Sequence, residues 1–361
     1  MQNGVFPSYD SARRAQRGDV ELRTCPTCTF TFNAAFDEYL MRYDATYDNS
    51  IDASPTYRAY LDERGRAVLP EVNTEARVLE IGCGKGTFLR QLVETHPRSS
   101  GLGVDATYEG ELADLNGRLH FERRYFSAAD AGRRIDAAVC RHVIEHVADP
   151  MQFLRDIRVG LAGSPDVHVF FETPSFEWIV EQTTFWDVFY EHCNYFTGPA
   201  LSRAFESAGF AIAKLERVFG GQFWWIEATL ASERNHLVPP AALFSDIIRF
   251  GLRTTAALDR LRGNFAEKHS HGAIALWGAA AKGTTLANLL DPDAHIIAAL
   301  VDLNPRKQGC FVGGSGHPIE SPQCLVTRAI STTVVVNPLY LAENTAIARR
   351  IGSRSQLMAL G

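Results

Sequence analysis

Short apolar runs alternate with helical segments through the middle of the chain, from Ala76 to about residue 235. Runs of this length, separated by helices of about ten residues, are typical of parallel βαβ units. The predicted strands are Arg77–Ile81, Ser100–Val104, Leu119–Tyr125, Ile135–Cys140 and Val167–Phe171, and the predicted helices are Thr87–Thr95, Pro150–Leu161 and Gly198–Ala208. We therefore expect a parallel α/β sheet.

The last two apolar runs of this region are joined differently. Phe210–Phe219 and Gln222–Leu230 are separated only by Gly220-Gly221, a tight turn that connects antiparallel strands. A parallel sheet that ends in a hairpin resembles the Rossmann-like sheet of class I methyltransferases. This likeness concerns the fold, so it makes a methyltransferase more expected but does not establish the function.

A second α/β pattern follows a polar break near Asn235–Pro240. The predicted elements are a helix at Ala241–Lys268, strands at Ala273–Leu276, Ile296–Val301 and Thr333–Val336, and a helix at Thr284–Leu290. Residues 1–75 are polar and rich in tyrosine, and they end in a predicted helix, Pro55–Leu69. We therefore predict a small N-terminal lobe (1–75), a central domain (76–235) and a second Rossmann-like domain (236–361).

Composition excludes several classes of protein. A net charge of −6 and a pI of about 6.0 argue against a nucleic-acid partner, which requires a basic surface. We find no apolar run long enough to span a membrane and no secretion signal at the N-terminus. The seven cysteines are mostly scattered. We therefore expect a cytoplasmic protein with reduced thiols.

The strongest chemical signal is the sequence Glu80-Ile-Gly82-Cys83-Gly84-Lys-Gly86, between a predicted strand and a predicted helix. Glycines allow a sharp turn and a close approach of the backbone to a ligand. Asp105 ends the next strand, where a carboxylate can accept both ribose hydroxyls of an adenosine. The sequence therefore predicts a cofactor loop rather than a plain strand-to-helix turn.

Two details favour S-adenosylmethionine over NAD as the ligand of this loop. The glycine spacing is G-x-G-x-G, whereas the dinucleotide spacing is G-x-G-x-x-G. Glu80 can also meet the ammonium group of an amino acid, whereas it would repel a pyrophosphate.

The string His142-Val143-Ile144-Glu145-His146 matches the H-x-x-E-H pattern of inverted zinc proteases. On a helix, its two histidines would share one face and could bind zinc. The string follows a strand directly, however, and the next helix begins only at Pro150. We favour a loop that brings Arg141 and His142 beside the cofactor, while ordinary loop histidines stay an open alternative.

The segment Phe185–Phe196 combines aromatic residues with an acid, an imidazole and phenols. Such a segment can be plain core. A carboxylate beside an imidazole in an aromatic pocket can also form a base whose pKa is adjusted for catalysis.

Five ordered stretches together resemble the sugar C-methyltransferase family. They are LRTCPTCTFTFN, VLEIGCGKGTFL, VIEHVADPMQFL, YEHCNYF, and the C-terminal WGAAAKGTTLANLL with VDLNPRKQG. The resemblance implies an N-terminal zinc lobe, a central S-adenosylmethionine-binding domain and a C-terminal Rossmann-like domain. It also implies methylation of a carbon next to a ketone in a nucleotide-linked deoxysugar.

Carried over to this chain, the resemblance makes His192 the base that forms an enolate and Glu191 its neighbour. Tyr190, His146 and His142 would line the acceptor site, with Tyr195 as a further substrate-binding residue. The chain also departs from the family, because it has one cysteine pair, Cys25 and Cys28, where the family has two. Two thiolates do not complete a tetrahedral zinc site.

Two further departures concern the acceptor site. Phe189 stands where the family commonly has a tyrosine, and His142 stands near the position of an asparagine. Both differences bear on which acceptor the protein would take.

The C-terminal unit has its own glycine turn, Gly278–Gly283, and Asp302 ends the strand that follows. By geometry it could hold a nucleotide, with Lys282 near a phosphate. A domain that only packs or dimerises is the alternative. The resemblance implies that the unit holds the nucleotide end of the substrate.

The sequence thus predicts an S-adenosylmethionine-dependent enzyme that methylates carbon. Transfer to oxygen or nitrogen of a small molecule is the second hypothesis, because such acceptors need less activation. A non-catalytic S-adenosylmethionine-binding scaffold is the third.

Overall fold

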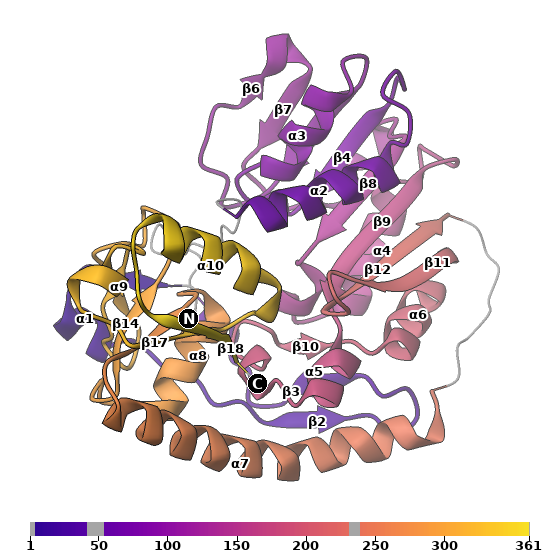
Figure 1. Ribbon diagram of the computed structural model, residues 1–361. Helices are drawn as coiled ribbons and strands as arrows, with labels where there is room; N and C mark the ends of the chain where they lie inside the picture. The colour runs from indigo at the N-terminus through magenta and orange to yellow at the C-terminus, as the bar shows by residue number, and fades with distance from the viewer. Residues whose placement is uncertain (1–3, 42–53, 231–238, 361) are drawn as a thin grey trace.

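The protein is described here by a computed structural model that covers residues 4–41, 54–230 and 239–360. Two α/β lobes lie side by side, and the long helix α7 (Ala241–Ser270) runs along one side of the molecule (Figure 1). The predicted boundary between the central and C-terminal domains, at 235/236, lies outside the described residues. The predicted division of the chain into three domains stays a prediction.

The larger lobe is built on an eight-stranded sheet in the order β11-β12-β9-β8-β4-β5-β7-β6. Its strands are β4 (Arg77–Ile81), β5 (Ser100–Val104), β6 (Ala113–Asp114), β7 (Leu119–Glu122), β8 (Ala137–Arg141), β9 (His168–Pro174), β11 (Ala211–Val218) and β12 (Phe223–Thr229). Strands β7, β5, β4, β8 and β9 are parallel, and β12 lies antiparallel between β9 and β11. The predicted Rossmann-like sheet ending in an antiparallel hairpin is therefore confirmed.

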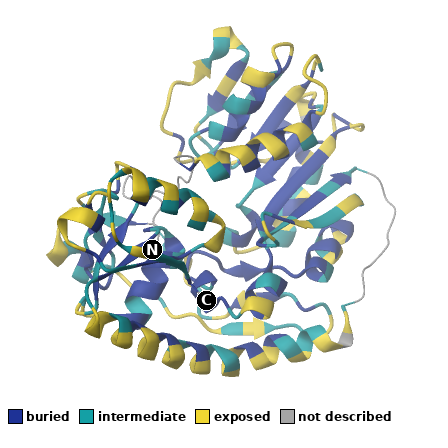
Figure 2. Ribbon diagram, in the orientation of Figure 1, coloured by how far each residue is buried: buried dark blue, intermediate teal, exposed yellow. Residues whose placement is uncertain are grey.

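Both faces of this sheet are buried, which explains its nearly continuous apolar strands. Neighbouring residues of β4 show the alternation, because Val78 belongs to one hydrophobic cluster and Leu79 to another. Helices α2 (Pro55–Val68) and α3 (Thr87–Thr95) contribute to the first cluster. Helices α4 (Pro150–Gly160) and α6 (Gly198–Ser207) contribute to the second. Figure 2 shows the strands as the most buried part of the lobe.

The second lobe contains a five-stranded parallel sheet in the order β16-β14-β13-β17-β18. Its strands are β13 (Ile274–Trp277), β14 (Ile297–Val301), β16 (Ile319–Glu320), β17 (Thr332–Val335) and β18 (Gln356–Ala359), and its helices include α8 (Ala281–Leu290), α9 (Cys324–Thr327) and α10 (Leu341–Arg350). The predicted second Rossmann-like domain is therefore confirmed in its fold. Strands β16 and β18 were not predicted, because β16 has two residues and β18 is not strongly apolar.

The N-terminal segment is divided between the two lobes. Strand β1 (Val5–Phe6) and helix α1 (Tyr9–Arg13) lie against β15 (Phe311–Val312) of the second lobe. Strands β2 (Leu22–Thr24) and β3 (Thr31–Asn33) form a three-stranded sheet with β10 (Asn194–Tyr195). The described strands of this segment therefore pair with short strands of the two lobes and join neither large sheet.

Several shorter helices complete the described fold. Helix α5 spans Phe176–Gln182. The 3-10 helices are η1 (Glu38–Leu40), η2 (Leu115–Gly117), η3 (Ala128–Gly132), η4 (Ile144–His146), η5 (Phe185–Asp187) and η6 (Pro338–Tyr340). None of the described helices, α7 included, is both long enough and apolar enough to cross a membrane.

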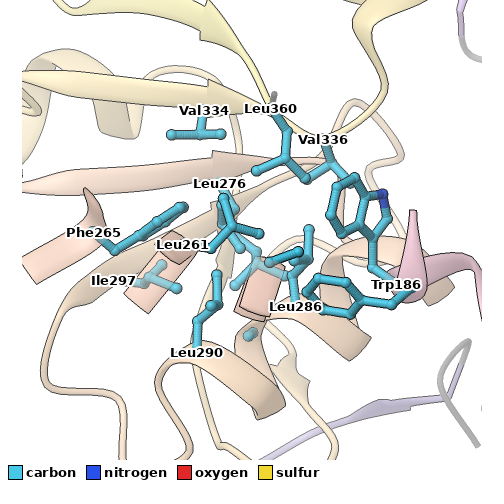
Figure 3. Close-up of a cluster of buried hydrophobic side chains, with 14 of the residues drawn as sticks. Trp186, Leu261, Phe265, Leu276, Leu286, Leu290, Ile297, Val334, Val336 and Leu360 are labelled. Carbon is cyan, nitrogen blue, oxygen red and sulfur yellow. The ribbon is translucent and has the colours of Figure 1, made fainter. Parts of the chain in front are cut away.

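The two lobes share one hydrophobic cluster. Trp186 of η5 is 7% exposed and lies beside Leu286, Val336 and Leu360 of the second lobe (Figure 3). Phe185 and Tyr195 belong to the same cluster. Burial of these aromatic side chains therefore attaches the Phe185–Phe196 segment to the C-terminal domain.

Replacing Trp186 with Ala is expected to lower the free energy of unfolding by about 3–5 kcal/mol, because it empties a large buried volume. Urea denaturation followed by circular dichroism measures the change. Tyr125→Ala is the control, since Tyr125 is 80% exposed and its loss should cost less than ~0.5 kcal/mol. Equal effects of the two substitutions would contradict a shared core between the lobes.

Candidate active site

The predicted cofactor loop is a tight turn between β4 and α3. Gly82 and Gly86 have φ values of 71° and 74°, which favour glycine. A Cβ atom on Gly82 would lie 2.3 Å from Cγ2 of Val143, and one on Gly86 would lie 2.4 Å from the Phe121 ring. A Cβ atom on Gly84 would meet no described atom within 4 Å. Side chains therefore pack against the turn at Gly82 and Gly86, whereas space remains at Gly84. A ligand could approach the backbone closely there.

Asp105 is tied directly to this turn. Its Oδ2 accepts a hydrogen bond from Gly84 N at 2.8 Å, and its Oδ1 accepts hydrogen bonds from the backbone N–H and the hydroxyl of Thr107. The carboxyl end of β5 thus lies next to the carboxyl end of β4, as the sequence predicts. Cys83, the remaining predicted residue of the loop, is buried.

Glu80 lies beneath the turn with 3% of its surface exposed. Its Oε2 makes no hydrogen bond to any described residue. Burial raises the pKa of Glu80 to about 8, although the nearby charge of Arg141 opposes the shift. A buried carboxylate oxygen without a partner suits a cationic ligand, so the ammonium group of S-adenosylmethionine fits this position.

A network of buried charged and phenolic side chains lies next to the turn, at the ends of β8 and β9. The sequence pattern did not predict this network. Arg141 donates to Glu172 Oε1 and to the Tyr57 hydroxyl, both at 3.0 Å. The Tyr60 hydroxyl donates to Glu172 Oε2. His142 Nε2 lies 2.6 Å from Glu172 Oε1. Glu172 could have been found from the sequence, since it follows the apolar run Val167–Phe171 as Asp105 follows Ser100–Val104.

Opposite charges determine the ionisation of this network. Burial alone would raise the pKa of Glu172, but Arg141 and His142 lower it to about 2. Burial alone would lower the pKa of His142, but Glu172 and Glu145 raise it to about 9. His142 also has φ of 53°, a backbone conformation that is uncommon for residues other than glycine. The protein therefore holds a charged imidazole beside the predicted cofactor loop.

The HVIEH string is a loop, as predicted, and not a helix. Its 3-10 turn, η4, covers Ile144–His146 and is followed by an extended residue, Val147. His142 and His146 are therefore not on one helical face. Instead, ligand atoms of Glu145, His146 and His192 lie within 4.8 Å of one another, so these three residues could hold a metal ion.

Three contacts attach the YEHCNYF segment to this turn. His146 Nδ1 lies 2.7 Å from the backbone oxygen of Glu191. Asn194 Nδ2 donates to Val147 O at 2.6 Å, and Cys193 Sγ donates to the Glu145 backbone oxygen at 3.5 Å. His192 is 8% exposed, and its ring centroid lies 4.7 Å from that of His146. Burial, together with the charges of His146, His142 and Lys282, lowers the pKa of His192 well below its usual value.

Two predicted substrate-contacting tyrosines use their hydroxyls within the protein. The Tyr190 hydroxyl accepts from Asp37 N at 2.7 Å and donates to Asp37 O at 3.2 Å. The Tyr195 hydroxyl accepts from Phe189 N and donates to Phe189 O. Both phenols thus hold hydrogen bonds within the protein, and that they contact substrate stays a prediction.

Two families of known domains match the chain. Residues 55–215 match the methyltransferase domain, and residues 226–352 match the C-methyltransferase C-terminal domain. The chain thus combines a methyltransferase domain with a C-methyltransferase C-terminal domain, which is consistent with a C-methyltransferase family. The predicted enzyme class, the methyl donor and the family resemblance are confirmed.

Individual relatives match only part of this methyltransferase. The chain is 35% identical over 88 residues to the ubiquinone biosynthesis O-methyltransferase of Ruegeria pomeroyi, covering 22% of this chain and 34% of that protein. It is 21% identical over 126 residues to the tRNA U34 carboxymethyltransferase of Nautilia profundicola, covering 33% and 41%. A solved O-methyltransferase-like structure from Nostoc punctiforme is 22% identical with a TM-score of 0.40, covering 48% of this chain and 57% of that one.

In the second lobe of the methyltransferase, the predicted pair Asp302 and Lys282 has separate partners. Asp302 Oδ2 accepts from Ala279 N at 3.0 Å, which repeats the contact between Asp105 and the first glycine turn. Lys282 Nζ lies 2.7 Å from Asp187 Oδ1 and donates to Gln222 Oε1 at 2.9 Å. Lys282 therefore joins the second glycine turn to η5 of the first lobe, which the sequence did not reveal.

Cys25 and Cys28 lie in the turn between β2 and β3. Thr29 N donates to Cys25 O and Cys25 N donates to Phe30 O, each at 2.9 Å. Hydrogen bonds from the backbone of Cys28 and Thr27 lower the pKa of Cys25, whereas burial raises that of Cys28. Within the described ranges, no third cysteine, histidine or carboxylate joins them in a metal-binding group. The described residues thus leave this predicted zinc site incomplete.

Replacing Glu80 with Gln is expected to stabilise the ligand-free protein at pH 8 and to weaken S-adenosylhomocysteine binding at least ~10-fold. Between pH 4.5 and 8 the unfolded chain loses this proton while the folded protein retains it. The native glutamate therefore costs stability as pH rises, on the order of 5 kcal/mol above pH 8. Urea denaturation at pH 5 and pH 8, with calorimetry of binding, measures both effects. A pH-independent difference in stability would contradict an unpaired buried Glu80.

Replacing Glu172 with Gln is expected to have the opposite effect on stability. The folded pKa of about 2 lies below the ordinary value of 4.5, so the native carboxylate stabilises above pH 4.5 and this gain disappears as pH falls towards 2. The variant should lose about 3 kcal/mol at neutral pH and much less near pH 3. Glu75→Gln, which removes an exposed partner of Arg98, is the control and should be near neutral.

Proposed function

We propose that this methyltransferase transfers a methyl group to a carbon atom next to a ketone in a nucleotide-linked deoxysugar. The observation that carries the proposal is the buried imidazole of His192, which the HVIEH turn holds near the charged network at the ends of β8 and β9. A carbon acceptor needs a base before it can attack, whereas many oxygen and nitrogen acceptors do not.

The donor end of the site uses the first glycine turn. S-adenosylmethionine, when bound, supplies a methyl group on a positively charged sulfur. Asp105, at the end of β5, would accept hydrogen bonds from the ribose hydroxyls. Glu80 would pair with the ammonium group, which supplies the partner that its Oε2 lacks among the described residues. The backbone of Gly82–Gly86 would approach the rest of the donor.

The acceptor end requires a proton acceptor and a group that stabilises an enolate oxygen. His192 removes the proton from the acceptor carbon, and the C–H electron pair enters the enolate. The positive charge of His142 would stabilise the enolate oxygen. The Glu191 backbone fixes the ring of neighbouring His146. The enolate carbon then forms a bond to the methyl group while the methyl–sulfur bond breaks, and its electron pair stays on sulfur.

The C-terminal domain would hold the nucleotide end of this acceptor. The backbone of its glycine turn donates a hydrogen bond to Asp302, and Lys282 of this turn forms an ion pair with Asp187 of η5. A phosphate that reached this turn would lie next to a lysine and to the first turn of α8. The domain therefore offers a nucleotide site next to the segment that carries His192.

We propose a cytoplasmic location, which agrees with seven free cysteines.

Replacing His192 with Ala is expected to lower turnover ~100-fold or more, because the acceptor carbon keeps its proton. Binding of S-adenosylhomocysteine should be unchanged. Turnover is measured by mass spectrometry as methylated product from a panel of nucleotide-linked keto sugars. The matched control is His269→Ala, an exposed histidine of α7, which should retain full activity.

An unchanged rate in the His192→Ala variant would remove His192 from the mechanism and favour an oxygen or nitrogen acceptor. Absence of any methylated product, with S-adenosylhomocysteine still bound, would favour a different acceptor class altogether.

A further inference from the structure

The cluster of Glu145, His146 and His192 combines three residue types that bind metal ions. Their ligand atoms lie within 4.8 Å of one another, and they come from the turn after β8 and from the segment before β10. Glu145 is 1% exposed and His192 is 8% exposed. The sequence suggested zinc at His142 and His146, but the fold instead joins His146 to a carboxylate and to a distant histidine.

The surroundings of the cluster orient its ligand atoms. The Glu191 carbonyl can only accept, so His146 carries a proton on Nδ1, and in the neutral ring the lone pair is on Nε2. Thr173 Oγ1 donates to Glu145 Oε2 at 3.0 Å. Hydrogen bonds of this kind, from the far side of a ligand to a carbonyl or a hydroxyl, accompany most metal-binding histidines and carboxylates.

Two buried atoms of the cluster lack hydrogen bonds. Glu145 Oε1 and His192 Nδ1 have no hydrogen-bond partner among the described residues, although Glu145 Oε1 lies 3.4 Å from His142 Nδ1. Leaving such groups unsatisfied costs about 1–3 kcal/mol each. A cation bound between the side chains would recover this cost.

We propose that Glu145, His146 and His192 bind a divalent transition metal ion of the zinc type. Two imidazoles and one carboxylate suit zinc and cobalt, with one position left for water or a ligand. Tetrahedral bonds of about 2.1 Å separate ligand atoms by roughly 3.4 Å, so ligand atoms that lie up to 4.8 Å apart must approach one another by up to roughly 1.4 Å. Rotation about side-chain bonds provides that movement.

Metal binding and proton abstraction compete for the same imidazole. This consequence rests on the proposed function, in which His192 accepts the proton of the acceptor carbon. An ion on His192 removes the lone pair that the proton would use. Zinc therefore inhibits methyl transfer, and chelation restores it.

The binding test uses the full chain, freed of metal with EDTA and titrated with Co²⁺ and Zn²⁺. Cys25→Ser/Cys28→Ser serves as a second background, because the thiol pair can bind metal independently. In the Cys25→Ser/Cys28→Ser protein, we expect one ion per chain. Bound Co²⁺ should give the visible absorption of a tetrahedral site without a thiolate band. Glu145→Gln, which can still accept from Thr173, should weaken binding at least ~10-fold. Glu71→Gln, an exposed loop carboxylate, should leave binding unchanged.

The activity test compares each variant with its own metal-free rate. Zinc should inhibit the native chain at stoichiometric concentration, and Glu145→Gln should need at least ~10-fold more zinc. Absent binding, or equal affinity in Glu145→Gln, would overturn the site. Binding with faster turnover would retain the ligand set but overturn both the competition and the role of His192 as base. If no acceptor is methylated, the binding test still decides the metal site.

Discussion

The attachment of the Phe185–Phe196 segment on three sides is the constraint on which the candidate acceptor site depends. Phe185 and Trp186 are buried in the core shared with the C-terminal domain. Asn194 binds the turn after β8, and β10 pairs with β3 of the N-terminal segment. Each attachment fixes a different part of the segment, so His192 is held in a defined position although it lies outside the large sheets.

Buried charge is distributed unevenly around the first glycine turn. Glu172 has cationic and phenolic partners, and its low pKa shows that the fold stabilises its charge. Glu80 lies two strands away in the sheet order, on the far side of β8. Its carboxylate has a raised pKa and one oxygen without a hydrogen-bond partner among the described residues. The fold therefore satisfies one carboxylate internally and leaves the other suited to a cationic ligand, at a cost in stability that is common at functional sites.

The two lobes use related local geometry for different contacts. In each, a carboxylate at the end of the second strand accepts from the backbone of a glycine turn, through Asp105 in one and Asp302 in the other. The first turn lies above a glutamate oxygen that has no hydrogen-bond partner in the described part of the chain, whereas the second carries Lys282, which pairs with Asp187. This ion pair and the shared aromatic cluster link the second turn to the segment that carries His192.

The sequence by itself determined the elements whose signals are local. Apolar periodicity predicts most strands of both sheets, although not β16 and β18. The glycine spacing with Glu80 and Asp105 predicts the cofactor loop, because these residues flank consecutive strands of one βαβ unit. Tertiary structure decided contacts between distant segments: His192 with Glu145 and His146, Tyr60 with Glu172, and Lys282 with Asp187. No periodicity encodes such pairs, since they depend on how separately predictable elements pack together, and burial then sets their ionisation.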